Sequence, residues 1–100
     1  MRTKTFTQLT APGSTDSYEV DDYNYHTIQY KVANKDTNVV AKIQGSLDNT
    51  NWFDCTNETT QTANGTYYLS FTGALRYIRF TFVSETGGTA ATINAVYFGG

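Results

Sequence analysis

The sequence predicts an all-β fold, an antiparallel β-sandwich or jelly-roll-like domain of about seven or eight strands. Short stretches of alternating apolar and polar residues recur along the chain, as expected for strands with one buried face. Clusters of Gly, Asn, Asp and Thr separate these stretches and mark turns. The 18 threonines, eight tyrosines and six phenylalanines are residue types that favour strands. At 100 residues, the length predicts a single β-sandwich domain over residues 1–100.

The N-terminal part has the weakest strand pattern. Residues 4–9 and 18–20 are strand candidates, and a Pro-Gly-Ser-Thr loop at 12–15 lies between them. We expect residues 1–16 to form an extended N-terminal arm, with residues 4–9 reaching a neighbouring protein. On this hypothesis, deletion of residues 1–10 leaves the fold intact and abolishes assembly.

The clearest strands are predicted in the first half of the chain. Residues 26–33 alternate, with Ile28, Tyr30 and Val32 pointing inward. Residues 39–47 repeat the arrangement, with Gly45 at a bulge or a close approach. In this second strand we expect inward side chains at Val39, Ala41, Ile43 and Leu47, and outward ones at Val40, Lys42, Gln44 and Ser46.

Turn sequences connect these strands to the second half of the domain. Residues 34–38 read as a turn, and the Asp-Asn-Thr-Asn segment at 48–51 predicts a hairpin that leads into residues 52–55. Residues 66–71 are the next strand, and residues 75–83 are a core strand that buries Ile78, Phe80 and Phe82. Residues 90–98 close the chain as a strand rich in small residues.

The composition argues against several classes of partner and cofactor. Seven basic and nine acidic residues give a formal net charge of −2, with no basic stripe for a phosphate backbone. The chain has no run of about 18 apolar residues and no secretory signal. Cys55 is the only cysteine, so we expect a buried, inert thiol and no thiolate metal site. We therefore predict no nucleic acid, no membrane, no metal and no cofactor.

The residues also argue against catalysis. His26 is the only histidine, and no nucleophile motif flanks it, so we interpret it as structural or interfacial. Two acidic sets are candidate calcium ligands, although neither has a recognised spacing, and a solvated loop and a turn explain them better. These sets are Asp16, Glu19, Asp21 and Asp22, and then Asp48, Asn49, Asn51 and Asp54. We predict that the protein is not an enzyme.

Aromatic residues are the best candidates for contacts with a partner. They are numerous enough that some must lie at the surface, where Tyr and Trp anchor protein interfaces or stack on sugars. For Trp52, a buried position after the hairpin is an equal alternative. The predicted partner-binding residues are Phe6, Tyr23, Tyr25, Trp52 and Tyr68.

The segment Ile43-Gln44-Gly45-Ser46-Leu47-Asp48-Asn49-Thr50-Asn51-Trp52-Phe53-Asp54, followed by Arg76-Tyr77-Ile78-Arg79-Phe80, resembles two groups of proteins. One is the discoidin-type, galactose-binding-like sandwich. The other comprises short β-sandwich virion structural proteins of tailed bacteriophages, and this resemblance extends from about Thr27 to the end of the chain.

The phage resemblance implies a non-enzymatic virion protein that is made in the host cytoplasm. The leading hypothesis is a capsid decoration, or cement, protein that binds major capsid subunits and self-associates as a homo-oligomer, for example a trimer. A tail, neck or head-fibre adaptor that binds other virion proteins is one alternative. A discoidin-like carbohydrate-binding module is the other, and it predicts aromatics clustered with Asp and Asn at one loop end.

Overall fold

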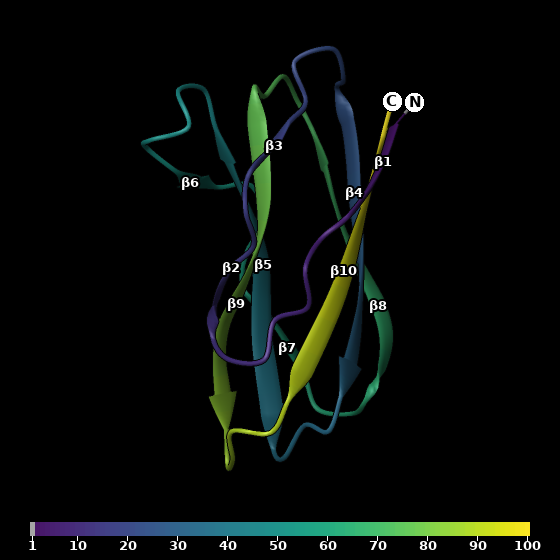
Figure 1. The fold of residues 1–100 in the computed structure, drawn as a ribbon, viewed down its shortest axis with the longest axis vertical. Coiled ribbons are helices and arrows are strands. Elements are labelled where there is room, and N and C mark those ends of the chain that lie inside the picture. Colours follow the sequence, from purple (N-terminus) through teal and green to yellow (C-terminus); the bar gives the residue numbers. More distant parts are fainter. Residues whose placement is uncertain (1) are drawn as a thin grey trace.

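The computed structural model describes residues 2–100, and Met1 lies outside the described residues. Two antiparallel sheets face each other in a β-sandwich (Figure 1). The four-stranded sheet has the order β1 (Arg2–Thr5), β10 (Thr92–Gly99), β4 (Tyr25–Ala33) and β8 (Gly65–Thr72). The six-stranded sheet has the order β2 (Gly13–Ser14), β9 (Tyr77–Thr86), β5 (Asn38–Ser46) and β6 (Phe53–Asp54), with β3 (Tyr18–Glu19) on β9 and β7 (Thr59–Gln61) on β5.

The predicted fold class is confirmed. Each long predicted strand has its counterpart, and the structure has ten strands because four segments of two or three residues also pair. Of these, β3 and β6 lie within the predicted segments 18–20 and 52–55, whereas β2 and β7 were not predicted, because so few residues do not show alternation. In the part of the chain that the structure describes, no helix is long and apolar enough to cross a membrane.

The core lies between the two sheets, where alternate residues of the long strands meet. Ile28, Tyr30 and Val32 are buried from β4, and Ile78, Phe80 and Phe82 are buried from β9, as their alternation predicts. The rings of Tyr30 and Phe80 lie 5.0 Å apart between centroids, so the two sheets are in direct contact. Gln61 on β7 donates a hydrogen bond to the Tyr30 hydroxyl at 3.2 Å.

The end of β5 departs from the predicted alternation. Leu47 is 58% exposed, so the prediction that it points inward is wrong. Ser46 is buried instead of outward, because its hydroxyl donates to the Asn51 carbonyl at 2.7 Å as the chain leaves the strand. Gly45 is a close approach: a Cβ placed there would lie 2.7 Å from Cδ2 of Leu75. The register shift of β5 lies between Val40 and Ala41.

The N-terminal segment is part of the sandwich, so the predicted extended arm over residues 1–16 is wrong for the described residues. β1 pairs with β10, with Arg2 opposite Gly99. Phe6 is only 3% exposed, and its N–H donates to the Ala95 carbonyl at 3.0 Å. Backbone pairing and burial of an aromatic ring hold this segment against the core.

Candidate functional site

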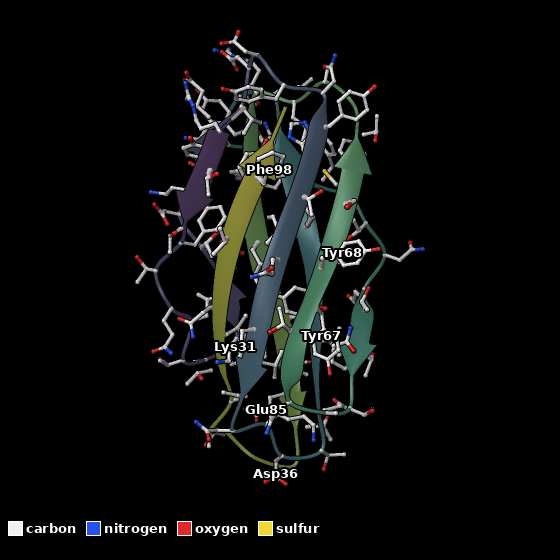
Figure 2. All side chains as sticks on the ribbon, turned by 90° about the vertical axis from the view of Figure 1, so that its right-hand side faces the viewer. Lys31, Asp36, Tyr67, Tyr68, Glu85 and Phe98 are labelled. Carbon is white, nitrogen blue, oxygen red and sulfur yellow. The ribbon has the colours of Figure 1, made fainter. Side chains whose placement is uncertain are left out.

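Three of the five large hydrophobic side chains that are exposed lie on the outer face of the four-stranded sheet. They are Tyr25 (67% exposed), Tyr68 (72%) and Phe98 (50%). Each occupies an outward position of its strand, because its chain neighbours within the strand point into the sandwich. We call the outward side chains of β1, β10, β4 and β8 the aromatic face, and Figure 2 shows it toward the viewer with Tyr68 and Phe98 labelled.

The aromatic face is nearly free of charge. Across the sheet, Thr27 pairs with Phe98 and Gln29 pairs with Tyr68, so hydroxyl and amide groups lie between the rings. Lys31 is the one charged side chain among the outward residues of the four described strands. Uncharged side chains with exposed aromatic rings lose little hydration free energy on contact with another protein. This face can therefore bind a protein surface at low cost in desolvation.

The outer face of the six-stranded sheet is different, because its polar side chains bond to one another. Gln44 accepts hydrogen bonds from Nε of Arg79 at 2.9 Å and from the Thr81 hydroxyl at 3.1 Å. Its amide donates to Asp54 at 3.0 Å, and Lys42 forms an ion pair with Asp54 at 3.0 Å. The hydrogen bonds that Asp54 accepts from Gln44 and Lys42 lower the pKa of its carboxyl group. Such a saturated network has few free groups for a partner.

The loop between β5 and β6 holds the other two exposed hydrophobic residues. Leu47 and Phe53 line a hollow of about 240 Å³ together with Asp48 and Asn51. The hollow is open and its walls are mostly apolar. It is the place where an aromatic ring, an Asp and an Asn meet at a loop end.

Asp48 builds this loop. Its carboxylate accepts the Asn51 N–H at 2.8 Å, the Asn51 side-chain amide at 2.8 Å and the Thr50 N–H at 2.9 Å. These donors hold the pKa of Asp48 well below its usual range. Asn49 adopts a left-handed φ of 62°, which Asn tolerates in turns. The turn prediction for residues 48–51 is therefore confirmed, and the carboxylate is occupied within the loop.

The single histidine is buried within the four-stranded sheet. His26 is 1% exposed, its Nδ1 lies 2.6 Å from the Tyr97 hydroxyl and its Nε2 lies 3.0 Å from the Gly73 carbonyl. A carbonyl only accepts, so Nε2 carries the proton and Nδ1 accepts from the Tyr97 hydroxyl. Burial lowers the pKa of His26. The ring is thus held neutral, and both of its nitrogens are engaged by structural groups.

The single thiol is held in its protonated form, and the described residues form no cluster of metal ligands. Cys55 is half-buried, and burial together with Asp54 raises the pKa of its thiol to about 11, so it stays protonated at neutral pH. Within residues 2–100, no three His, Cys, Asp or Glu side chains gather in a way that would hold a metal ion.

The five predicted partner-binding residues fall into three environments. Phe6 belongs to the core, so its prediction as a surface contact is wrong. Tyr23 is half-buried under the Arg2 guanidinium, which lies 5.7 Å from its ring centroid. Trp52 is half-buried under Arg79 at 4.2 Å, beside the six-stranded sheet. Tyr25 and Tyr68 lie on the aromatic face.

Three exposed residues were not predicted. Ile93, Ala95 and Tyr97 are the alternate, inward-pointing residues of β10, so Phe98, which comes directly after Tyr97, points outward. This alternation was the signal in the sequence that could have predicted the exposure of Phe98. Leu47 and Phe53 had no such signal, because their exposure depends on where β5 ends and on the path of the loop.

A family model described as a domain of unknown function, DUF6385, matches residues 21–99. The chain belongs to this family. The match spans every long strand of the sandwich, from β4 to β10. No curated protein sequence matches the chain.

Two solved structures share the fold. The SPBc2 prophage-derived protein YomS is similar with a TM-score of 0.65 and 17% identity, over 96% of this chain and 90% of that chain. CpGH89CBM32-5 from Clostridium perfringens, in complex with GalNAc-beta-1,3-galactose, is similar with a TM-score of 0.52 and 19% identity, over 87% of this chain and 67% of that chain. The chain thus shares its sandwich with a phage-derived protein and with a protein of discoidin-like fold.

Proposed function

We propose that this chain is a non-enzymatic structural protein of a tailed-phage particle, a capsid decoration protein that binds major capsid subunits through the aromatic face. The observation that carries the proposal is the grouping of Tyr25, Tyr68 and Phe98 on one sheet face that carries a single charged side chain. The similarity to a prophage-derived protein over nearly the whole chain supports a phage origin.

The sheet gives this face the properties of a rigid docking surface. Its side chains stand on strands paired on both sides in β4 and β10, so few backbone degrees of freedom remain to be lost on binding. Tyr and Phe present large contact areas with few rotatable bonds, and the surrounding Thr and Ser hydroxyls can bond to a partner's backbone.

The test is co-sedimentation of the purified protein with heads, and separately with tails, of the phage that encodes it. Tyr25→Thr/Phe98→Thr removes two exposed rings from the aromatic face and replaces them with β-branched residues, which also favour strands. We expect saturable binding to heads, weakened at least about tenfold by this double variant. The matched control is Leu47→Thr/Phe53→Thr, which removes two exposed apolar side chains elsewhere and should bind normally.

Each outcome of the co-sedimentation experiment has a different interpretation. Binding to tails alone would replace the decoration hypothesis with that of a tail adaptor. Absence of binding to any particle fraction, or equal binding by both double variants, would contradict the role of the aromatic face.

Glycan binding at the β5–β6 loop is a second candidate function. It is favoured by the hollow in which Phe53 lies beside Asp48 and Asn51, and by the similarity to a structure that holds a disaccharide. An exposed ring can stack on the apolar face of a sugar, and free amide oxygens can accept from its hydroxyls. Against it, the Asp48 carboxylate is already occupied by groups of its own loop.

A glycan array with the purified protein tests this second candidate. If the hollow binds sugars, Phe53→Ala should lose the signal, whereas Phe98→Ala on the aromatic face should retain it. Absence of a signal for any glycan at millimolar ligand would remove this candidate and leave the particle-binding hypothesis unaffected.

A further inference from the structure

The free edge of β8 differs from the other described sheet edges. The opposite edge of the same sheet is β1, which has four residues and carries Arg2 and Lys4. The edges of the six-stranded sheet consist of segments of two or three residues: β2, β3, β6 and β7. β8 has eight residues, and the chain has neither a charged residue nor a proline between Glu58 and Arg76. An edge strand is protected from pairing with another chain when it is short or carries charged side chains. β8 is long and uncharged, so it lacks both kinds of protection.

The backbone groups that face this edge follow from the hydrogen bonds at the end of β8. Gly73 N–H donates to the Asn24 carbonyl at 2.8 Å, and residues of an antiparallel pair alternate between bonded and non-bonded positions. Odd-numbered residues of β8 therefore bond to β4. The residues whose N–H and C=O groups face outward are Thr66, Tyr68, Ser70 and Thr72, and all four are exposed.

The other side of β4 gives the same assignment independently. Tyr25 N–H donates to the Gly100 carbonyl at 3.0 Å and Gly100 N–H returns a bond at 3.0 Å, so odd-numbered residues of β4 bond toward β10. Even-numbered residues of β4 consequently bond toward β8, where they pair with odd-numbered residues such as Leu69 opposite Ile28.

The core is also incompletely covered along this edge. The inward side chains of β4 are at most 1% exposed. The inward apolar side chains of β10 are at most 2% exposed. On β8, by contrast, the inward side chains of Tyr67, Leu69 and Phe71 are only partly buried. A further strand beside β8 would satisfy the open backbone groups and cover these side chains.

We propose that a second copy of this chain pairs with this edge, β8 against β8 in antiparallel orientation, about a two-fold axis at Leu69. In this register Tyr68 lies opposite the partner's Ser70, and Thr66 lies opposite the partner's Thr72. Each pair of even-numbered residues then joins two residues whose backbone groups face the edge and whose side chains lie on the same face. The two four-stranded sheets become one continuous sheet.

Two properties favour a second copy of the chain as the partner of this edge: the strand carries no charge, and the resulting assembly ends at a dimer. Two identical uncharged strands approach without like-charge repulsion, and an isologous contact needs a strand that pairs with itself. The combined sheet ends on a short, positively charged β1 at both edges, so the pairing stops at a dimer. The aromatic faces of both copies then lie on one side of the joined sheet.

The oligomeric state of the purified protein tests this pairing, by sedimentation equilibrium or by light scattering after gel filtration. We expect the mass of two 11.1 kDa chains. Tyr68→Glu/Ser70→Glu places like charges opposite each other across the two-fold axis and should raise the dimer dissociation constant at least about tenfold. Both positions are exposed, so the monomer should stay folded, as circular dichroism would verify.

The matched control introduces side chains of opposite charge at the same two positions. In Tyr68→Lys/Ser70→Glu, each lysine faces a glutamate of the partner, and the dimer should persist. A register centred on Tyr68 would bring the two lysines together and give a monomer. A monomeric wild-type protein, a dimer that tolerates the double glutamate variant, or dissociation of both double variants would overturn the pairing at Leu69.

Amide exchange gives a second measurement. The Tyr68 and Ser70 N–H groups should become protected as protein concentration rises, while the N–H groups of Tyr67 and Leu69, which bond to β4, should be protected at every concentration. The pairing does not depend on particle binding. A monomer that binds phage heads would refute the dimer alone, and a dimer that ignores them would refute the proposed function alone.

Discussion

His26 is a buried imidazole whose two nitrogens are both committed to neutral-state hydrogen bonds. It donates to the Gly73 carbonyl and accepts from the Tyr97 hydroxyl, and it also stacks on Phe71 with 6.3 Å between ring centroids. Protonation would add a buried charge and remove the acceptor for the Tyr97 proton. The residue therefore couples the stability of the fold to pH.

The sign of this coupling follows from the lowered pKa of His26. As pH falls below about 6.5, the unfolded chain binds a proton before the folded chain does. We expect the free energy of unfolding, measured by urea titration, to fall between about pH 7 and pH 5 with a slope of at most about 1.4 kcal/mol per pH unit. The loss ends once pH is below the folded-state pKa.

His26→Gln is the control variant for this pH dependence. It should be less stable at pH 7 and should lack the slope between about pH 7 and pH 5, because glutamine does not titrate. Asp48 and Asp54, whose pKa values are lowered from 3.8, should add their own loss only at lower pH. An unchanged slope in the variant would assign the effect to other groups.

At the scale of single elements, the N-terminal strand shows where sequence patterns fail. β1 has four residues, and its strand character depends on β10 at the far end of the chain. Local alternation cannot reveal such a partner, and the same segment therefore resembles a free arm. Phe6 looked like an exposed ring for the same reason, whereas the long strands β4 and β9 were predicted because each carries its own periodicity.

The deletion of residues 1–10 consequently has a different expected result from the one that a free arm implies. The truncated chain loses Phe6 from the core, and it exposes the edge of β10. We expect it to be strongly destabilised, and Phe6→Ala alone should lower the free energy of unfolding by about 3–5 kcal/mol. Urea unfolding measures both effects.

Thr7→Ala is the control for this segment, since Thr7 follows Phe6 directly and is exposed. It should change the free energy of unfolding by no more than about 0.5 kcal/mol. If the truncated chain unfolded at the wild-type urea midpoint, the packing of residues 2–9 against the sandwich would be contradicted.

At the scale of the whole molecule, alternation predicted the sandwich because each long strand separates a buried face from a wet one. Tyr25 and Tyr68 were surface candidates for a different reason, namely the large number of aromatic residues in the chain. Alternation could not predict that they share one face with Phe98, because that depends on the strand order β10-β4-β8. Nor could it predict that Trp52 lies under Arg79, a contact between a loop and a strand distant in sequence. The site therefore required the topology, whereas the fold class did not.

The strand order also governs how the protein forms during synthesis. β10 is the last strand to leave the ribosome, yet it lies inside the four-stranded sheet, between β1 and β4 (Figure 1). Until β10 has emerged, β1 has no neighbour in the four-stranded sheet, and Ile93, Ala95 and Tyr97 are missing from the core. Folding of this domain is therefore completed only after β10 has been synthesised, and every nascent chain that lacks β10 exposes the strand edge of β4 to chaperones and to other nascent chains.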